Sequence, residues 1–321
     1  MNTDSHKPIT LAIVVPCYNE QQALPITAPR LLQLLDKLTD EGWTTPDSYI
    51  LCSNDGSRDN TWAVINNLHN ADPRIKGISL AHNRGHQNAL LAGLMTVRNN
   101  CDAAVSIDAD LQDDPEAIAD MVYEYVVNGA EIVYGVRASR ATDTWFKRST
   151  AHAFYSLQEK MGAESVYDHA DYRLMSNRAL NLLSEYHESN LFLRGIIPHI
   201  GLKSAIVTYN RAPRVAGESK YPLKKMLSFS IDGITSFSAR PMRWIFGIGA
   251  CMVFLDIIVA IWVFIVHFVK GTDPGWASLM LSVWFIGGLI LISLGIVGEY
   301  IGKIFIEVKQ RPRYAIEQKL W

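Results

Sequence analysis

Two aspartates that flank one alanine, Asp108 and Asp110, are the sharpest chemical signal in the sequence. They follow residues 103–107, an apolar run typical of a buried β-strand. Because side chains two apart on an extended chain point to the same side, both carboxylates can face one ligand. Carboxylate oxygens suit Mg²⁺ or Mn²⁺, and such a cation can hold a diphosphate and offset the charge that builds as it departs. A helix-cap cluster is the alternative, and we assign capping to Asp114, which precedes a proline.

Polar residues also end two other predicted strands. Residues 9–16 lead into PCYNE, and residues 49–53 lead into NDGSRDNT. In the second cluster, Asp55 can accept the imide N–H of uracil, or it can close an Asx-turn. The first cluster can hold a base and a ribose through ring contact and hydroxyl hydrogen bonds, although each residue alone is typical of a turn. Its members are Pro16, Tyr18, Asn19 and Glu20.

Strands and helices alternate through the first 134 residues, and this order predicts a mostly parallel, doubly wound α/β sheet. The predicted strands are residues 9–16, 49–53, 75–80, 103–107 and 131–134, and the predicted helices are 24–41, 61–70, 87–99 and 116–128. Ligands of such sheets bind outside the carboxyl ends of the strands. All three polar clusters fall there, so we predict one site built from three strand ends.

The composition narrows the class of protein. The 321 residues suffice for one large soluble domain with an appendage, and the net charge of −2 does not point to nucleic acid. The cysteines have no CxxC spacing, which argues against zinc and against a disulfide framework. The N-terminal stretch MNTDSHKPIT is polar and lacks the apolar segment of a signal peptide, so we do not expect the domain to be exported.

Residues 244–306 differ from the rest because they are almost devoid of charge. Two apolar runs, at about 244–268 and 276–298, are each long enough to cross a membrane, which takes roughly 20 residues. The polar turn VKGTDPG joins them, so we predict a transmembrane helical hairpin. Two buried core helices are the alternative, but core helices are rarely apolar on every face. In the first run, Asp256 is either a neutral acid packed between helices or a contact for lipid phosphate or another subunit.

Basic residues decide the predicted orientation. The turn between the two runs carries only Lys270, whereas positive charge flanks both outer ends of the hairpin. The flanking residues are Lys220, Lys224, Lys225, Arg240 and Arg243 before the first run, and Lys303, Lys309, Arg311, Arg313 and Lys319 after the second. The positive-inside rule then puts both ends in the cytoplasm. We expect a multi-pass protein of the cell (inner) membrane with a cytoplasmic N-terminal domain.

The predicted organisation has four parts. Residues 1–220 form the cytoplasmic α/β domain, 244–306 contain the two spans, and 307–321 form a basic cytoplasmic tail. Residues 221–243 predict an interfacial amphipathic helix with its basic end near anionic headgroups, and packing of this helix on the domain is the alternative. Its apolar residues at helical spacing are Leu227, Ile231, Ile234 and Phe237.

An ordered set of motifs carries a family resemblance. PCYNE, NDGSRDNT, NRGHQNALLAGL and IDADLQDDPE are followed by YGVRASR, DHADYRLMSNRAL, FLRGI and RVAGESKYPLKKM. In this order they resemble the family-2 glycosyltransferases with the GT-A fold. With the C-terminal hairpin, nearly the whole chain is similar to polyprenyl-phosphate glycosyltransferases of the bactoprenol glucosyltransferase type, and dolichyl-phosphate mannose synthases are more distant relatives.

The resemblance implies roles for individual residues. On the donor side, Asp55 would bind the uracil, and Asp108 and Asp110 would bind the metal ion and the diphosphate. Three further residues would lie near the nucleotide or the diphosphate: Arg84, His86 and Gln112. On the acceptor side, Asp171 stands where the family places an acidic residue, although ADYR departs from the usual GDFR.

The resemblance also implies basic residues around the phosphates of donor or acceptor. These are Arg137, Arg173, Arg214 and Lys220. Each arginine could instead form a structural ion pair, and Lys220 could be an interfacial lysine that extends toward the headgroups. The resemblance further admits a homo-tetramer formed through the membrane helices.

The implied reaction transfers a hexose from a UDP-sugar to polyprenyl (undecaprenyl) phosphate, and glucose is the expected sugar. The product would be a lipid-linked monosaccharide for cell-envelope glycan modification. A phosphate monoester is already anionic near neutral pH, since its second pKa is about 6, so it needs positioning more than deprotonation. Arginine suits this because its fork grips phosphate oxygens while it stays charged. We expect direct displacement with inversion, in which Asp171 acts as a base or as a positioning group.

Two other functions remain open at this point. A processive polysaccharide synthase shares the catalytic fold, but such enzymes typically carry QxxRW and more spans, and here Arg243 and Trp244 lack the glutamine. A non-catalytic membrane scaffold that binds nucleotide sugars is the second alternative. The intact DAD and ADYR motifs argue against it.

Overall fold

The computed structural model describes residues 6–137, 169–188, 193–210 and 275–321, and five isolated residues between 251 and 265. The chain divides into two compact units. The sheet unit comprises 1–155, 164–221 and 311–321, and the helical unit comprises 156–163 and 222–310. The predicted amphipathic helix at 221–243 and nearly all of the first predicted span lie outside the described residues.

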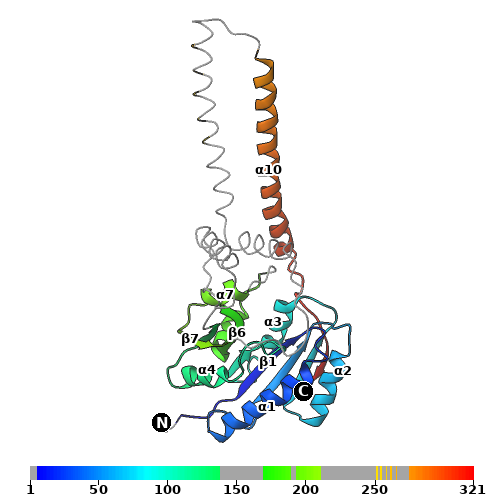
Figure 1. Ribbon diagram of the computed structural model, residues 1–321, viewed down its shortest axis with the longest axis vertical. Coiled ribbons are helices and arrows are strands. Elements are labelled where there is room, and N and C mark those ends of the chain that lie inside the picture. Colours follow the sequence, from blue (N-terminus) through cyan, green and yellow to red (C-terminus); the bar gives the residue numbers. More distant parts are fainter. Residues whose placement is uncertain are drawn as a thin grey trace. The chain divides into compact units, whose positions relative to one another are not determined.

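The sheet unit is built on one eight-stranded sheet in the order β7-β5-β6-β4-β1-β2-β3-β8 (Figure 1). The strands are β1 Leu11–Cys17, β2 Tyr49–Asn54, β3 Ile75–Leu80, β4 Ala103–Ser106, β5 Ile132–Arg137, β6 His169–Ser176, β7 Ser204–Tyr209 and β8 Ile316–Leu320. β1 to β4 run parallel, as does the β5–β7 pair. β6 is antiparallel to β4 and β5, and β8 is antiparallel to β3. The predicted mostly parallel α/β sheet is therefore confirmed.

The helices of the sheet unit are α1 Leu24–Asp40, α2 Thr61–Ala71, α3 His86–Val97, α4 Ala117–Val126, α6 Asn177–Leu183 and α7 Leu193–His199. The first four helices and the first five strands begin and end within three residues of their predicted bounds. The agreement follows from hydrophobic spacing, since α1 buries Leu31, Leu35 and Leu38 on one face.

The central strands β1, β2 and β4 are buried along their whole length, as expected where helices cover both faces of a sheet. Alternate residues of β1, including Ile13 and Val15, belong to the same core cluster as the buried face of α1. Val14 points the other way, toward α3, where a Cβ added to Gly93 would lie 2.4 Å from the Val14 Cγ1 atom. Glycine thus lets α3 approach the sheet closely, which places the first turn of α3 near the strand ends.

The C-terminal segment, expected to be a basic tail, contributes strand β8. Its residues pair with β3, with Leu320 opposite Gly77. Trp62 donates its indole N–H to the Gln318 side-chain oxygen at 2.5 Å. The Lys76 ammonium lies 3.9 Å from the centroid of a Trp321 ring, a favourable cation–π distance. This end of the chain is therefore part of the sheet unit.

The helical unit contains α10, Trp276–Val308, which begins at the start of the second predicted span and continues beyond its end. The extension carries Glu299, Lys303 and Glu307 at a spacing of four, which favours helix. Its 33 residues rise about 50 Å at about 1.5 Å each, more than a hydrocarbon core of about 30 Å. Within the described residues, one stretch is long and apolar enough to cross a membrane, Phe285–Val308 with a mean hydropathy of 1.9.

Candidate active site

The pairing of β4 with β6 builds the centre of the site. Arg173 of β6 lies opposite Ser106 of β4 in an antiparallel register. Two residues further toward the same edge, the chain reaches Asp108 just after the end of β4 and Asp171 within β6. The Ser106 hydroxyl donates to the Asp171 backbone carbonyl at 2.5 Å and so ties the two strands together at this point. The register thus brings together two aspartates that are 63 positions apart in the sequence.

The DAD turn presents its carboxylates by burying the residue that follows each of them. Ala109 and Leu111 are buried, whereas Asp108 and Asp110 stay partly accessible. Leu111 adopts a left-handed conformation with φ +49°, which is unusual for a leucine. The Thr27 hydroxyl of α1 donates to the Ala109 carbonyl at 2.6 Å. The predicted alternation in the DAD motif is therefore present, and α1 holds the turn in place.

Asp108 stands in an excess of negative charge. Burial raises the pKa of its carboxyl to about 6, His86 opposes the rise, and nearby carboxylates add to it. Those carboxylates belong to Asp113, Asp171 and Asp110. The side chain is still 48% exposed, so solvent moderates the effect of burial. A carboxyl crowded by other carboxylates gains most from a cation.

The residues present fit a divalent cation bound by two carboxylates. Asp108 and Asp110 offer hard oxygen ligands, and Asp110 Oδ1 also accepts the backbone N–H of Gln112 at 3.2 Å. The described part of the chain holds no cluster of three or more His, Cys, Asp or Glu side chains suited to a metal. Two carboxylates are enough for Mg²⁺ and similar cations, which bind to one or two carboxylates together with substrate phosphates and water.

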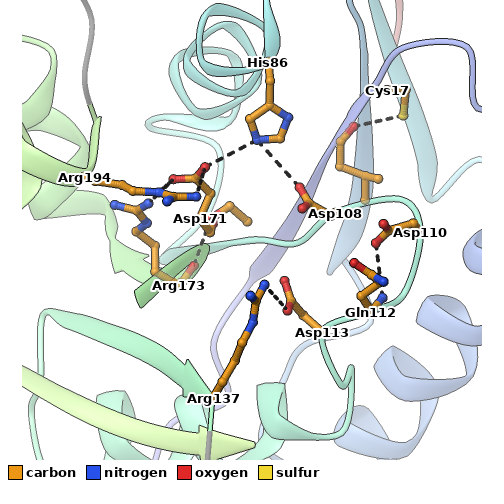
Figure 2. A network of polar contacts seen from close by, with 12 residues as sticks. Cys17, His86, Asp108, Asp110, Gln112, Asp113, Arg137, Asp171, Arg173 and Arg194 are labelled. Atoms are coloured by element: carbon orange, nitrogen blue, oxygen red, sulfur yellow. Dashed lines mark hydrogen bonds and ion pairs between the residues drawn. The ribbon is translucent and has the colours of Figure 1, made fainter. Parts of the chain in front are cut away.

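Asp171 stands in the opposite environment, among cationic side chains (Figure 2). The Arg173 Nη2 atom donates to Oδ1 at 2.7 Å, and Arg194 donates through Nε to Oδ1 and through Nη2 to Oδ2, both at 3.2 Å. The His86 Nε2 atom lies 3.6 Å from Oδ2. Burial alone would raise the pKa of Asp171, but His86, Arg194 and Arg173 together hold it well below the usual range. Asp171 therefore stays ionised in the folded protein.

His86 connects the two carboxylates. It is the first residue of α3, and its Nε2 atom lies 3.7 Å from Asp108 Oδ1 as well as 3.6 Å from Asp171 Oδ2 (Figure 2). Burial lowers the pKa of His86, but hydrogen bonding of its imidazole N–H to the Asp171 carboxylate and the charges of Asp108 and Asp171 outweigh burial, so the pKa is raised. The site therefore has an acidic end and a cationic end with an imidazole between them.

Asp55 acts on the loop that leads into α3. It is buried, and its carboxylate accepts the backbone N–H groups of Arg84 at 2.7 Å and Gly85 at 2.9 Å. Gly56 allows this close approach, because an added Cβ would lie 2.6 Å from the backbone of the 82–83 segment. The uracil contact stays a prediction, and the structure adds that Asp55 orders the turn that carries His86.

The two N-terminal polar clusters meet at one edge of the sheet. Asn19, in a left-handed conformation, donates its N–H to Ser57 Oγ at 3.0 Å, and its side-chain oxygen accepts the N–H of Arg58 at 2.9 Å. Glu20 donates its N–H to Thr61 Oγ1 at 2.9 Å. Pro16 lies opposite Ser53 in the β1–β2 register, and the side chains of Tyr18 and Arg84 are exposed. The structure thus joins these clusters, whereas their contact with a nucleotide stays a prediction.

A second acidic group, which the sequence did not mark as part of the site, lies beside Arg137. Asp113 is buried and accepts the Tyr209 hydroxyl at 2.5 Å, and Arg137 Nη2 lies 3.5 Å from the same oxygen. Asp114 accepts the backbone N–H of Glu116 at 3.1 Å, which closes an Asx-turn before α4. The predicted helix cap at Asp114 is wrong, because the N-cap position of α4 is Glu116 and it carries no side-chain cap hydrogen bond. The repeated acid in LQDDP was a signal for this arrangement, but the partner Tyr209 is 96 positions away.

The structure changes the set of basic residues that the sequence predicted for the phosphates. Arg173 is only 1% exposed, and its Nε and Nη1 atoms have no hydrogen-bond partner among the described residues. Arg194, quoted only as part of FLRGI, was given no role, although the structure places it on Asp171. Two of the predicted phosphate ligands, Arg214 and Lys220, lie outside the described residues.

Two family models match the sequence. The model for glycosyl transferase family 2 matches residues 12–197, which include Asp55, His86, Asp108, Asp171 and Arg194. The model described as the GtrB C-terminal hairpin matches residues 240–304. The second match covers both predicted spans, and its name agrees with the predicted helical hairpin.

Curated relatives match almost the full length. An uncharacterized glycosyltransferase, YkoT of Bacillus subtilis, is 52% identical over 97% of this chain and 92% of its own length. The bactoprenol glucosyl transferase of Shigella phage SfII is 38% identical over 96% of this chain and 97% of its own. Among solved structures, mannosyl-3-phosphoglycerate synthase from Rubrobacter xylanophilus is 17% identical, with a TM-score of 0.48 and 74% of each chain covered.

Proposed function

This chain belongs to glycosyl transferase family 2, and we propose that it transfers glucose from UDP-glucose to the phosphate of a polyprenyl lipid. The observation that carries the proposal is the charge layout of the site, which pairs an acidic end at Asp108 with a cationic end at Asp171. A donor diphosphate bound through a cation and an anionic acceptor need these two environments side by side. The names of relatives such as the phage SfII enzyme support this choice of donor sugar and acceptor.

At the acidic end, Asp108 and Asp110 would hold Mg²⁺ or Mn²⁺ together with the donor diphosphate. When bound, the cation supplies charge stabilisation to the departing diphosphate. Gln112, whose backbone N–H already contacts Asp110, would complete the turn around that group. Asp55 and the residues at the ends of β1 and β2, including Tyr18 and Glu20, would hold the uridine.

At the cationic end, we propose that Asp171 positions cations and does not accept a proton. Its oxygens are already occupied by Arg173 and Arg194, and its pKa is held well below the usual range. Such a carboxylate is a poor base near neutral pH, since a general base works best with a pKa close to the operating pH. The acceptor phosphate, with a second pKa of about 6, is already anionic and needs no base.

The proposed chemistry is a single displacement at the anomeric carbon. An acceptor phosphate oxygen forms the new bond to that carbon as the bond to the UDP oxygen breaks, and the electron pair leaves with UDP. No proton moves in this step, and the anomeric configuration inverts. The protein's contribution is then positioning and electrostatics, which are large terms in group transfer to and from phosphates.

The membrane part of the proposal follows from the hairpin. We propose two spans with both ends in the cytoplasm, so that the sheet unit meets its soluble donor on that side. The match of residues 240–304 to a hairpin model and the apolar stretch Phe285–Val308 support this arrangement. Assembly of several copies through the hairpin remains part of the proposal, to be checked by the mass of the detergent-solubilised protein.

The test is a transfer assay with the full chain, a panel of nucleotide sugars and undecaprenyl phosphate. We expect a lipid-linked monosaccharide with UDP-glucose, loss of activity with a chelator, and recovery with Mn²⁺ or Mg²⁺. A polymer product would instead indicate a processive synthase. Binding of nucleotide sugar without any product under all conditions would indicate a non-catalytic scaffold.

A further inference from the structure

Two arginines share the carboxylate of Asp171, but they differ in access to solvent. The side chain of Arg173 is 1% exposed, whereas that of Arg194 is 40% exposed. Arg173 approaches from β6 itself, two residues along the same strand. Arg194 approaches from α7 and places both its Nε and Nη2 atoms on the carboxylate. A ligand arriving from solvent can therefore reach the second guanidinium and not the first.

Arg194 is held in place by its own helix. Leu193, Ile196 and Ile197 are fully buried, which fixes α7 against the rest of the sheet unit. The backbone N–H of Leu193 donates to the Gln87 side-chain oxygen at 3.1 Å, and Gln87 follows His86 in α3. The first turns of α7 and α3 are thus linked, so Arg194 and His86 keep a constant relation to Asp171.

The position of Arg194 separates it from the donor end. Figure 2 shows Arg194 and His86 at different sides of the Asp171 carboxylate, and Asp108 beyond His86. A cation and diphosphate at Asp108 would therefore meet His86 before Arg194. The second anion in the reaction, a phosphate monoester, is the one that fits beside Arg194.

Arginine suits such a contact because its planar fork makes charge-assisted hydrogen bonds to phosphate while it stays charged. The Asp171 carboxylate sets the plane of the Arg194 guanidinium through two hydrogen bonds, so less freedom is lost when phosphate binds. Arg173 is buried beneath the same carboxylate and could reach phosphate only if the site opened.

We infer that Arg194 binds the phosphate monoester of the acceptor, and that Arg173 is a positioning residue that acts through Asp171. This inference rests on the proposed function and deepens it, because it changes which arginine meets the acceptor. Arg173 was expected from the sequence to lie among the phosphates, whereas Arg194 was given no role there.

The test compares Arg194→Met and Arg194→Lys with a matched control, Arg178→Met, an arginine of α6 that is 70% exposed and paired with Glu131. Steady-state transfer is measured with a short-chain, water-soluble polyprenyl phosphate, which removes effects of membrane partition. We expect Arg194→Met to raise the KM for this acceptor about 10- to 100-fold, in line with loss of a charge-assisted hydrogen bond. Arg194→Lys should recover part of the loss, and Arg178→Met should stay within about twofold of the parent protein.

Measuring donor binding shows whether Arg194 contacts the acceptor phosphate or the donor diphosphate. The Kd of UDP-glucose with Mn²⁺, measured by calorimetry without acceptor, should change by less than about twofold in both Arg194 variants, because the lost contact is not to the donor. Inorganic phosphate, used as an inhibitor competitive with the acceptor, should lose potency in Arg194→Met and not in Arg178→Met.

The inference is overturned if both folded Arg194 variants keep the parent acceptor KM, or if they weaken donor binding instead. If Arg194→Met does not fold, Arg194→Lys decides by the same two measurements. Failure of the proposed function looks different, because the parent protein itself would then transfer no sugar to any polyprenyl phosphate.

Discussion

Asp108 and Asp171 lie at the same edge of the sheet, one just after β4 and the other within the neighbouring β6, yet their surroundings are opposite. Burial of Asp108, together with neighbours that are mostly carboxylates, raises its pKa to about 6. Around Asp171 the neighbours are two arginines and a histidine, and the pKa falls well below the usual range. The same side chain is thus prepared at one position to receive a cation and at the other to hold cations that can receive an anion.

The difference teaches that residue type alone does not assign a role in this site. Both aspartates look like metal ligands or bases when read singly. Their neighbours decide, because a nearby opposite charge favours the ionised carboxylate and a nearby like charge disfavours it. Four substitutions or conditions can break or sharpen this contrast, and we take them from the largest expected effect to the smallest.

Removing the charge at the acidic end should have the largest effect. In Asp110→Asn we expect turnover to fall by at least about 1000-fold, roughly 4 kcal/mol, because the cation loses an ionised ligand next to the departing diphosphate. The transfer assay measures this, and circular dichroism checks that the protein still folds. Asp120→Asn, on the exposed side of α4, makes the same charge change away from the site and should leave turnover unchanged. Normal activity in Asp110→Asn would refute the metal role.

Removing the buried guanidinium of Arg173 at the cationic end should lower the stability of the fold. In Arg173→Met we expect the free energy of unfolding to fall by about 3 kcal/mol, the low end for breaking a buried ion pair, since Arg194 and His86 still face Asp171. Chemical denaturation in detergent measures the loss. Arg178→Met should cost less than about 0.5 kcal/mol, as expected of an exposed pair. Equal stability of the two variants would contradict a structural role for Arg173.

Lowering the pH should weaken cation binding at Asp108 while Asp171 stays ionised. The folded pKa of Asp108 lies above its ordinary value, so its charged form is disfavoured and its stability contribution is lost as the pH rises through about 6. A cation competes with this proton, and we expect Mn²⁺ affinity to fall by about fivefold between about pH 6 and pH 5. Calorimetric Mn²⁺ titrations measure the change, and Asp108→Asn should remove this pH dependence. Asp171 stays ionised over this range because its pKa is lowered.

Loosening the link between the two ends should have the smallest effect. In Ser106→Ala the hydroxyl that donates to the Asp171 carbonyl is lost, which we expect to cost about 1 kcal/mol of stability and a few-fold in kcat. Ser184→Ala is the matched control, since its hydroxyl donates to the Asn181 carbonyl at the end of α6. It should lower stability by a similar amount and leave kcat unchanged. Equal kcat values for both variants would show that this hydrogen bond does not set the spacing of the two aspartates.

Local patterns were enough to predict the first half of the sheet unit. The strands and helices up to Arg137 followed from apolar spacing, and the DAD turn was located because a polar pair ends an apolar run. Parallel order then placed three polar clusters at one edge. Each of these inferences uses residues close together in the sequence, where backbone geometry alone constrains the result.

The strands beyond this region were not predicted, for two physical reasons. β6 runs against its neighbours, so Asp171 lies near the start of its strand and not after its end, although it reaches the same edge. β8 is five residues long and mostly exposed, and its partner β3 is more than 200 positions away. Pairings of this kind depend on distant side chains and on backbone hydrogen bonds, which leave almost no local pattern.

The sequence by itself determined the kinds of chemistry available: paired carboxylates after a strand, arginines suited to phosphate, and an apolar C-terminal region long enough for a membrane. Only the tertiary structure decided which of these groups meet. It placed Arg194 beside Asp171, buried Arg173 beneath it, and set His86 between Asp171 and Asp108. The reason is that burial and distance set the strength and the reach of a charge, and both are properties of the folded chain.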